Sequence, residues 1–524
     1  MNDGVMQPYR LTLDKLLDHA AKWHPDTEVV TAGADGVNAR LGYASLRDRA
    51  LRVSGVLARL GVGRGGRVAT LAWNSQAHVE AWYAIMGMGA TCHTLNPRLT
   101  AEQSAAMLRQ SKAEILIVSA DLLPLARKVA ALAPMRTILT IDGGGGEAGP
   151  GIQSLEALLV DPPLDVSWGD FDETTVCGLC FTSGTTGQPK GVSYTHRSTY
   201  LHTLRLLQAD VMALAAKDVV LPVVPMFHAS AWGIPFAAPA VGAKLVLPGR
   251  HMDGPSLAGL IVSEGVTVAA GVPTVWLALV EHLEAVGGDV PTLERILVGG
   301  SPMPPALMER IERRLGVAVQ TSWGMTELSP LGTMAPPGDP HRAAGVSGRP
   351  ALGVDLLLTD AEGRSLPCQR ETEGHLRVRG ASVVERYLGQ AEPATDAHGW
   401  FDTGDLARID REGNLIITGR AKDLIKSGGE WINPTEIEAI VSELPEVSLA
   451  AVVGRSDPKW GERPILLVEL RKDQDLTDEQ LLAPLKGRVA SWWIPDDVVR
   501  LRKMPTAATG KVDKSHLRSQ YGRT

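Results

Sequence analysis

The ten residues from Thr182 to Gly191 combine three glycines, four hydroxyl side chains and one lysine. They follow an apolar run, residues 176–181, that predicts a buried strand, and they precede an extended segment leading toward a helix. Glycines allow backbone N–H groups to turn toward an anion, hydroxyls add donors, and lysine supplies a positive charge. This order predicts a polyphosphate-binding loop rather than a flexible surface connection.

The segment differs from a Walker P-loop, because Gln188 and Pro189 separate Gly187 from Lys190 and a glycine follows the lysine. The whole string resembles the phosphate loop of the adenylate-forming enzymes, which include acyl-CoA synthetases, peptide-synthetase adenylation domains and firefly-type luciferases. The resemblance implies contacts with ATP from Thr182, Ser183, Gly184, Thr185, Thr186, Gly187 and Lys190.

The length and net charge of the chain limit the number of domains and the kinds of protein to be expected. A chain of 524 residues is too long for one simple core, so we expect two or more domains. A net charge of −7 argues against non-specific nucleic-acid binding. The N-terminus carries no signal-peptide pattern, and residues 221–247 are apolar but interrupted by prolines, which disfavours a transmembrane segment. We therefore expect a soluble cytoplasmic protein.

The Cys177–Cys180 pair has the spacing of some metal and redox sites. A zinc site would need two further ligands at matching spacing, and none is visible in the sequence. The pair also lies in the strand that enters the phosphate loop. We therefore interpret both residues as buried apolar cysteines.

Helical and strand patterns alternate in the first part of the chain, which predicts helices packed on a largely parallel sheet. The Gly61–Gly66 segment matches G-x-G-x-x-G but follows a helix instead of a strand, so we interpret it as a helix-ending turn. Hairpin-like segments occupy residues 374–419. We predict helices at 11–23, 43–60 (capped by Ser45), 78–86, 434–443 and 477–489, and strands at 67–73, 114–118, 136–141, 447–454 and 464–470.

The fold class we expect is α/β. Residues 1–420 would form a large N-terminal adenylation domain of α/β subdomains with a small β-barrel-like part. Residues 421–524 would form a small, mobile C-terminal α/β domain, as the resemblance implies.

Four further segments match motifs of adenylate-forming enzymes. In residues 320–327, the resemblance implies that Trp323 stacks on adenine, Thr326 contacts the α-phosphate and Glu327 holds Mg²⁺. A flat aromatic ring suits a purine, and a carboxylate is a hard ligand suited to Mg²⁺. Trp323 replaces the tyrosine usual in the family. The adenine-side loop would include Gly300 and Ser301, while Asp405 would bind the ribose hydroxyls.

The remaining motifs lie at the predicted domain boundary and near the C-terminus. The resemblance implies that Arg420 contacts ribose or phosphate, that Lys422 is the hinge, and that Lys511 reaches the carboxylate and α-phosphate during adenylation. Gly428 and Gly429 would approach the pantetheine of coenzyme A, and Glu430 would assist thiol attack.

The implied reaction uses ATP, Mg²⁺ and coenzyme A to activate a carboxylic acid. In amino-acid-activating domains of the family, an aspartate pairs with the amine of the substrate. The corresponding residue here is His228, which disfavours an amino-acid substrate. Several segments resemble the branch containing medium-chain fatty acyl-CoA and 3-(methylthio)propionate-CoA ligases, which implies a short or medium apolar acid. The candidate pocket residues are His228, Trp232, Gly300, Gly324, Met325, Pro330 and Leu331.

Three alternatives remain open from the sequence. The substrate could be an aryl acid such as a cinnamate or benzoate, the chain could be a luciferase-like adenylating enzyme, or it could be a non-enzymatic nucleotide sensor. A homodimer is possible, because dimers occur in similar enzymes.

Overall fold

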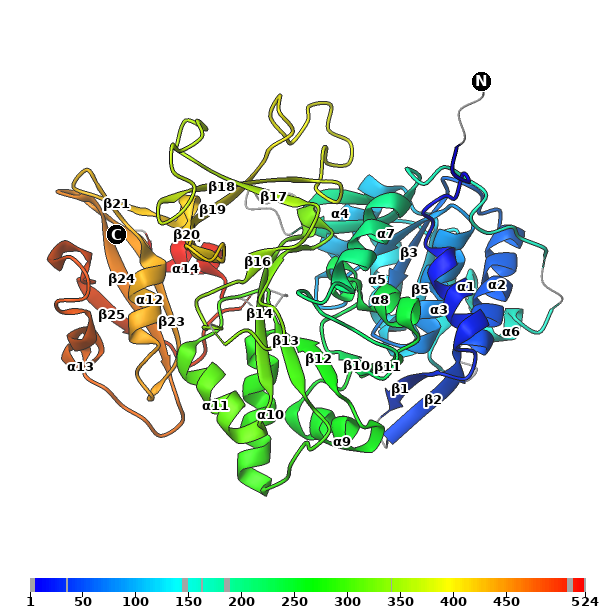
Figure 1. Ribbon diagram of the computed structural model, residues 1–524, viewed down its shortest axis with the longest axis horizontal. Coiled ribbons are helices and arrows are strands. Elements are labelled where there is room, and N and C mark those ends of the chain that lie inside the picture. Colours follow the sequence, from blue (N-terminus) through cyan, green and yellow to red (C-terminus); the bar gives the residue numbers. More distant parts are fainter. Residues whose placement is uncertain are drawn as a thin grey trace.

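Two large sheets form the centre of the protein, with helices between them and on their outer faces (Figure 1). The computed structural model describes residues 5–33, 36–143, 149–161, 164–182, 189–340, 342–506 and 512–522, and every structural statement below refers to these residues. This arrangement confirms the predicted α/β class.

The first sheet has seven strands, and all neighbouring pairs are parallel except the last. Its side chains alternate between two cores: Val68 faces the centre of the protein, whereas Ala69 and Leu71 face the outer helices. In spatial order the strands are β7 (Ile152–Ser154), β6 (Thr137–Ile141), β5 (Ile115–Ser119), β3 (Arg67–Leu71), β4 (Thr91–Thr94), β8 (Val176–Thr182) and β9 (Lys190–Thr195).

The second sheet has nine strands, of which the central ones are parallel and the edge pairs antiparallel. In spatial order they are β16 (Arg349–Pro350), β15 (Leu331–Met334), β14 (Ala318–Gly324), β13 (Arg295–Val298), β12 (Val268–Gly271), β10 (Val219–Pro222), β11 (Lys244–Leu247), β1 (Glu28–Gly33) and β2 (Gly36–Gly42).

The helices form three layers around these sheets. The layer between the sheets contributes to the largest apolar core and contains α1 (Asp14–Trp23), α2 (Tyr43–Arg59), α3 (Gln76–Gly87), α7 (His196–Leu206) and α8 (Ile234–Val241). The outer layer of the seven-stranded sheet contains α4 (Ala101–Ser111) and α5 (Leu123–Leu132). The outer layer of the nine-stranded sheet contains α9 (Gly254–Glu264), α10 (Pro273–Val286) and α11 (Pro305–Leu315).

The small β part predicted for the N-terminal region is a four-stranded antiparallel sheet. Its strands are β17 (Val354–Thr359), β18 (Glu373–Gly380), β19 (Phe401–Ile409) and β20 (Leu415–Arg420). Turns at 360–363 and 410–413 follow β17 and β19, where the N–H of Gly363 donates to the carbonyl of Asp360 and that of Gly413 to the carbonyl of Asp410.

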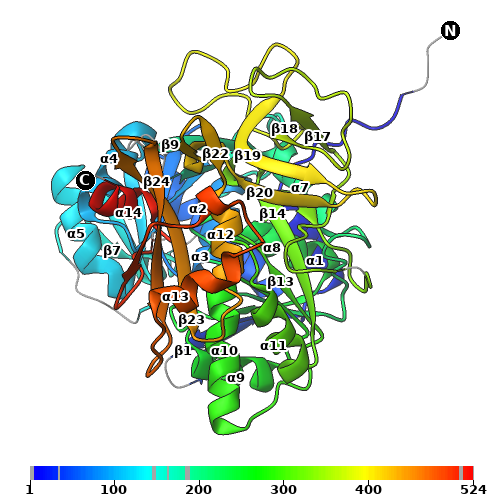
Figure 2. The ribbon, with the colours of Figure 1, turned by 90° about the vertical axis from the view of Figure 1, so that its left-hand side faces the viewer.

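The C-terminal elements surround a separate five-stranded sheet (Figure 2). One face of this sheet packs against α12 (Pro434–Val441) and α13 (Asp478–Leu482), and the other against α14 (Lys514–Tyr521). The strands are β21 (Ile425–Ser427), β22 (Glu430–Ile432), β23 (Val447–Asp457), β24 (Gly461–Leu470) and β25 (Asp497–Arg500).

Two local predictions are wrong. Ser45 lies inside α2, whose N-cap is Gly42 and carries no side-chain cap. The predicted helix at 477–489 stops after Leu482, because Pro484 lacks an N–H and cannot continue the helical ladder. The Gly61–Gly66 segment does follow α2 and precede β3, as expected of a helix-ending turn.

Cys177 and Cys180 are both buried, and burial raises the pKa of each thiol above its ordinary value. The described residues contain no group of three or more His, Cys, Asp or Glu side chains arranged to hold a metal. None of the described helices is long and apolar enough to cross a bilayer.

Candidate active site

Several of the predicted site residues follow the carboxyl ends of strands in both large sheets. In the nine-stranded sheet, β10, β13 and β14 lead into the segments that carry Trp232, Gly300 and Glu327. In the seven-stranded sheet, β8 leads into the predicted phosphate loop. Crevices at the carboxyl ends of parallel strands are the usual ligand sites of open α/β sheets.

The phosphate loop connects two antiparallel strands. Thr182 is the last residue of β8 and lies opposite Lys190, the first residue of β9. The two residues therefore flank the base of the loop, and because they are directly paired their side chains lie on the same face of the sheet. The loop residues Ser183, Gly184, Thr185, Thr186 and Gly187 lie outside the part of the chain that the structure describes.

Glu327 lies in a short row of polar side chains that begins at Lys190. The Lys190 Nζ atom is 5.0 Å from the centre of the Tyr387 ring, and the Tyr387 hydroxyl donates to Glu327 Oε1 at 2.9 Å. Burial and the Glu327 carboxylate raise the pKa of the Tyr387 phenol above its ordinary value, so the hydroxyl remains a donor. Glu327 is 8% exposed.

This environment fits Mg²⁺. The ion keeps several waters and needs only one or two protein carboxylates when phosphates complete its shell. Glu327 offers one buried carboxylate whose orientation is fixed by the neutral Tyr387 hydroxyl. The other ligands would come from water and substrate phosphates.

Residues 382–388, which we call the bridging segment, connect this carboxylate to the phosphate-loop strand. The N–H of Val384 donates to the carbonyl of Glu327 at 2.7 Å, and the N–H of Leu388 donates to the carbonyl of Gly191 at 2.8 Å. The Tyr194 hydroxyl adds a third connection by donating to the carbonyl of Thr326 at 2.8 Å. The two sheets are thereby joined at the predicted phosphate and metal residues.

Trp323, Asp405 and Arg420 form a second cluster. The Trp323 indole N–H donates to Asp405 Oδ2 at 2.9 Å, while Arg420 Nε lies 2.6 Å from Asp405 Oδ1. Asp405 is 2% exposed, and Arg420 also donates to the carbonyl of Thr403. The predicted adenine residue and the predicted ribose residue therefore touch each other directly.

Trp232 lies in a turn with unusual backbone geometry. The φ angles of Ala229, Ser230, Ala231 and Trp232 are 44°, 55°, 47° and 56°, a left-handed run that L-residues adopt only at a cost. The ring of Trp232 packs near Gly299, immediately before Gly300. Strain of this kind concentrates at functional sites, which agrees with a pocket role for this turn.

Four other pocket candidates lie in or beside one tight connection between β14 and β15: Gly324, Met325, Pro330 and Leu331. The N–H of Met325 donates to the carbonyl of Pro330 at 3.0 Å, and a Cβ at Gly324 would lie 2.3 Å from the same oxygen. Only glycine fits at position 324 with this loop conformation. His228 is half-buried at the start of the Trp232 turn.

Two buried side chains of α7 hold Leu331 in place. The N–H of Leu331 donates to His202 Nε2 at 3.3 Å, and burial lowers the pKa of His202 to about 3, which keeps the ring neutral. Arg205 donates to the carbonyl of Leu352 and to the Ser382 hydroxyl, both at 2.9 Å. Burial lowers the pKa of Arg205 to about 10, so the guanidinium stays charged at neutral pH.

Replacing Arg205 with methionine should lower the thermal midpoint by about 5 °C, because several buried acceptors would lose their donor. The acceptors include the carbonyls of Leu331, Leu352 and Gly353. Thermal unfolding followed by circular dichroism would measure the shift. Arg313→Met is the control, since that side chain is 71% exposed on α11. An equal, small shift for both variants would contradict the prediction.

The predicted coenzyme A segment is a tight hairpin between β21 and β22. Ser427 pairs with Glu430, so Gly428 and Gly429 form a two-residue turn with φ values of 61° and 92°. Positive φ at both positions is the geometry of a type I′ turn, which favours glycine. Gly428 also lies against the ring of Trp460, to whose carbonyl its N–H donates at 2.7 Å.

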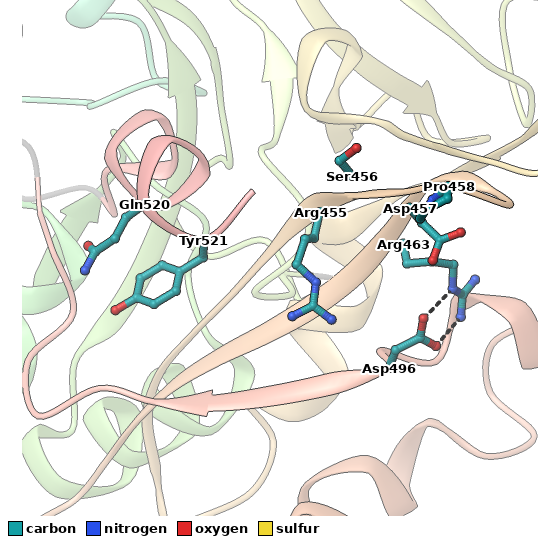
Figure 3. Close-up of a pocket in the computed structure, with 8 residues that line it drawn as sticks. All are labelled: Arg455, Ser456, Asp457, Pro458, Arg463, Asp496, Gln520 and Tyr521. Carbon is teal, nitrogen blue, oxygen red and sulfur yellow. Dashed lines mark hydrogen bonds and ion pairs between the residues drawn. The ribbon is translucent and has the colours of Figure 1, made fainter. Parts of the chain in front are cut away.

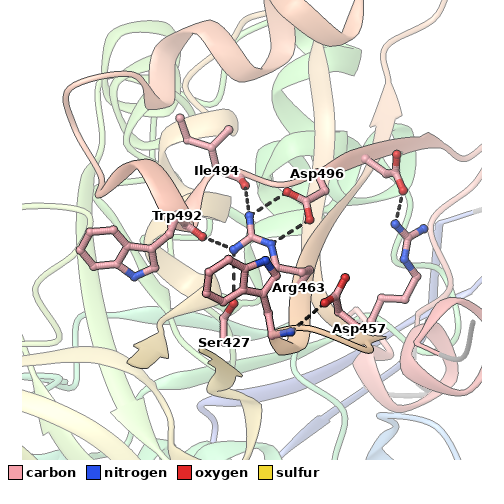
Figure 4. A network of polar contacts seen from close by, with 9 residues as sticks. Ser427, Asp457, Arg463, Trp492, Ile494 and Asp496 are labelled. Carbon is pink, nitrogen blue, oxygen red and sulfur yellow. Dashed lines mark hydrogen bonds and ion pairs between the residues drawn. The ribbon is translucent and has the colours of Figure 1, made fainter. Parts of the chain in front are cut away.

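Arg463 fastens this hairpin to the rest of the C-terminal sheet (Figure 4). Its guanidinium donates to both carboxylate oxygens of Asp496, at 2.7 and 2.8 Å, and to the Ser427 hydroxyl at 3.3 Å. The same side chain lines a cavity of about 330 Å³ together with Arg455 and Tyr521 (Figure 3). The hairpin is thus held by a charged network in addition to the apolar packing of Ile425 and Ile432.

The predicted residues separate into two groups. The first group consists of the two clusters described above, Lys190 with Thr326 and Glu327, and Trp323 with Asp405 and Arg420, which residues 323–327 join along the chain. Glu430, Gly428, Gly429 and Lys422 are exposed on the C-terminal elements, and among the described residues Glu430 makes no side-chain hydrogen bond with the first group. Lys511 falls in a stretch that the structure leaves undescribed. Sequence reasoning missed Tyr387, whose segment carries no periodic or turn signal.

Comparison with known proteins identifies the class to which this arrangement belongs. The profile of the family described as AMP-binding enzyme matches residues 17–388, and that of the AMP-binding enzyme C-terminal domain matches residues 436–511. The chain therefore belongs to the AMP-binding enzyme family. This confirms the resemblance to adenylate-forming enzymes.

Individual relatives cover nearly the whole chain. It is 40% identical to 3-methylmercaptopropionyl-CoA ligase of Ruegeria lacuscaerulensis, over 99% of this chain and 98% of that protein. It is 38% identical to medium-chain-fatty-acid–CoA ligase of Ectopseudomonas oleovorans, over 99% and 97%. The fold is similar to ATP-bound MatB from Rhodopseudomonas palustris, with a TM-score of 0.85 and 26% identity over 98% and 99% of the two chains.

Proposed function

We propose that this protein is an AMP-forming ligase that joins a short- or medium-chain apolar carboxylic acid to coenzyme A. The observation that carries the proposal is the pair of clusters at the two ends of one segment, residues 323–327. Trp323 contacts the carboxylate expected to bind ribose, and Glu327 lies in the row that begins at the phosphate-loop lysine. Relatives at 38–40% identity over the full chain are CoA ligases, which supports the same reaction class.

In the first half-reaction, a carboxylate oxygen of the acid attacks the α-phosphorus of ATP and pyrophosphate leaves. Thr182 and Lys190 would bind the β- and γ-phosphates with the loop between them. Mg²⁺ held by Glu327 would neutralise phosphate charge. Thr326 and Lys511 would stabilise the negative charge that grows on the α-phosphoryl group, and stabilisation of this kind is usually the largest single contribution to such catalysis.

In the second half-reaction, the thiol of coenzyme A attacks the acyl carbon, and AMP leaves with one oxygen of the original carboxylate. We propose that the hairpin at Gly428 and Gly429 approaches the thiol and that Glu430 assists its deprotonation. These residues and Lys511 belong to the C-terminal part of the chain, so the domain after residue 420 would turn about Lys422 between the two halves.

Gly428→Ala should slow thioester formation from supplied acyl-adenylate about tenfold while changing adenylation little. The new methyl group would meet the Trp460 ring at 2.8 Å and would also force alanine into a left-handed conformation. Rapid-quench assays of the two half-reactions would measure both rates.

Gly429→Ala is the matched control for this effect. It has the same left-handed strain, with a φ of 92°, but its methyl group would meet no atom within 4 Å. A larger effect at 429 than at 428, or a loss confined to adenylation, would contradict the proposed role of the hairpin.

The acid substrate can be determined with a panel of carboxylic acids. Purified protein, ATP, Mg²⁺ and coenzyme A would be incubated with straight-chain acids from C3 to C12, 3-(methylthio)propionate, and benzoate- and cinnamate-type acids. We expect mass spectrometry to detect thioester and AMP with a short or medium apolar acid. If turnover is fastest with an aryl acid, the substrate is an aryl acid and not a short- or medium-chain apolar acid. Light emission without thioester would favour a luciferase-like enzyme, and nucleotide binding without pyrophosphate release would favour a sensor.

The proposal also covers the cellular location and the oligomeric state of the protein. We expect the protein to act in the cytoplasm, which cell fractionation would test. A homodimer is possible, because dimers occur in similar enzymes, and light scattering coupled to size-exclusion chromatography would distinguish a dimer from a monomer.

A further inference from the structure

We infer that Trp323 is a positioning residue that orients Asp405 toward the ribose of ATP. Trp323 would therefore favour nucleotides that carry ribose hydroxyls, in addition to stacking on the purine. The inference rests on the proposed function, which assigns ribose binding to Asp405. It gives Trp323 a role that depends on its indole N–H and not only on its aromatic face.

The hydrogen bond is the first observation. Trp323 Nε1 donates to Asp405 Oδ2 at 2.9 Å, while Arg420 Nε lies 2.6 Å from the other oxygen. The carboxylate is therefore held through both oxygens by two separate elements, β14 and β20. A carboxylate held in one orientation before ATP arrives loses less entropy when it accepts bonds from two hydroxyls.

The fixed position of the indole is the second observation. A Cβ at Gly332 would lie 2.4 Å from Cζ3 of Trp323, so the six-membered ring packs directly on the backbone of β15. Leu328 belongs to the same apolar core as Trp323, and the tryptophan is 8% exposed. The indole is thus held in one rotamer, with its N–H directed at the carboxylate.

The burial of Asp405 is the third observation. The residue is 2% exposed, so little water can reorient it. A hydrogen bond to a charged group in such a setting is stronger than one between neutral groups. Phenylalanine at position 323 would keep an aromatic face for the purine but would have no donor for Asp405.

The test is calorimetric titration of the full-length protein with MgATP and with its 2′,3′-dideoxy analogue. Wild-type protein should bind ATP about 10- to 100-fold more tightly than the analogue. Trp323→Phe should weaken ATP binding about 10-fold and weaken analogue binding less than about twofold, because the analogue has no hydroxyls for Asp405 to accept from. In the Asp405→Ala background, Trp323→Phe should add less than about twofold to the loss of ATP binding.

Trp82→Phe is the matched control. That indole N–H also donates inside the core, to His78 Nε2 at 3.0 Å, but it lies on α3 away from the site. The control should keep the wild-type preference for ATP. A general loss of packing would instead change the two tryptophan variants alike.

Three results would overturn the inference. Trp323→Phe could weaken both nucleotides equally, which would make Trp323 a stacking residue only, or it could change neither. Wild-type protein could fail to distinguish the two nucleotides, which would remove the ribose role of Asp405 as well. Because the titration needs neither acid nor coenzyme A, the inference can fail while the ligase proposal stands, and the reverse also holds.

Discussion

Replacing Lys511 with alanine should abolish adenylate formation while largely sparing thioester formation from supplied acyl-adenylate. Lys511 is expected to place its charge on the carboxylate and α-phosphate only during the first half-reaction. Loss of one such charge from a transition state costs about 100- to 1,000-fold in rate. Pyrophosphate exchange into ATP would measure the first half, and release of coenzyme A thioester from synthetic acyl-adenylate would measure the second.

A lysine nearby in the sequence supplies the control for this prediction. Lys503 is exposed and precedes Lys511 by eight residues, so Lys503→Ala removes a comparable charge from the same part of the chain. Both half-reactions of that variant should match wild type. If Lys511→Ala slows the two halves equally, the lysine does not act in adenylation alone, and the division of work between two domain positions is wrong.

Replacing Glu327 with glutamine should slow adenylation about 100- to 1,000-fold, because the amide no longer offers a charged oxygen to Mg²⁺. The variant keeps the size of the side chain, and its amide oxygen can still accept from the Tyr387 hydroxyl. We also expect a higher Mg²⁺ concentration at half-maximal rate. Pyrophosphate exchange measured across a Mg²⁺ series gives both quantities.

Two other variants show whether this effect is specific. Tyr387→Phe removes only the hydroxyl that orients Glu327 and should slow the same step about tenfold, as expected for one hydrogen bond to a charged group. Glu430→Gln removes a carboxylate from the exposed hairpin and should leave adenylation unchanged. Adenylation by Glu327→Gln within about tenfold of wild type would exclude Glu327 as the essential metal ligand.

Much of the fold could be predicted because its signals are local. The strands predicted at 114–118 and 136–141 are the buried parallel strands at 115–119 and 137–141, and glycine-containing turns end the hairpins. The errors have local causes too. Pro484 ends a helix that the apolar pattern continues, and Gly42 serves as N-cap where Ser45 was expected.

The candidate residues of the site could be proposed from the sequence, since each lies in a contiguous string. Their connections could not, because these depend on residues far apart in the sequence. Tyr387 reaches Glu327 across 60 positions, and Trp323 reaches Asp405 across 82. From the sequence, Trp323 is only a replacement for the tyrosine usual in the family. The structure instead reveals a new donor, which only the packing of β15 under the indole could show.

The central claim is that the acid is activated by direct attack on the α-phosphorus of ATP. The most direct test uses a carboxylic acid labelled with ¹⁸O in both carboxylate oxygens, together with ATP, Mg²⁺ and coenzyme A. Our account predicts AMP that carries one ¹⁸O atom and a thioester that keeps the other. Label in inorganic phosphate or pyrophosphate, or unlabelled AMP beside labelled thioester, would contradict it.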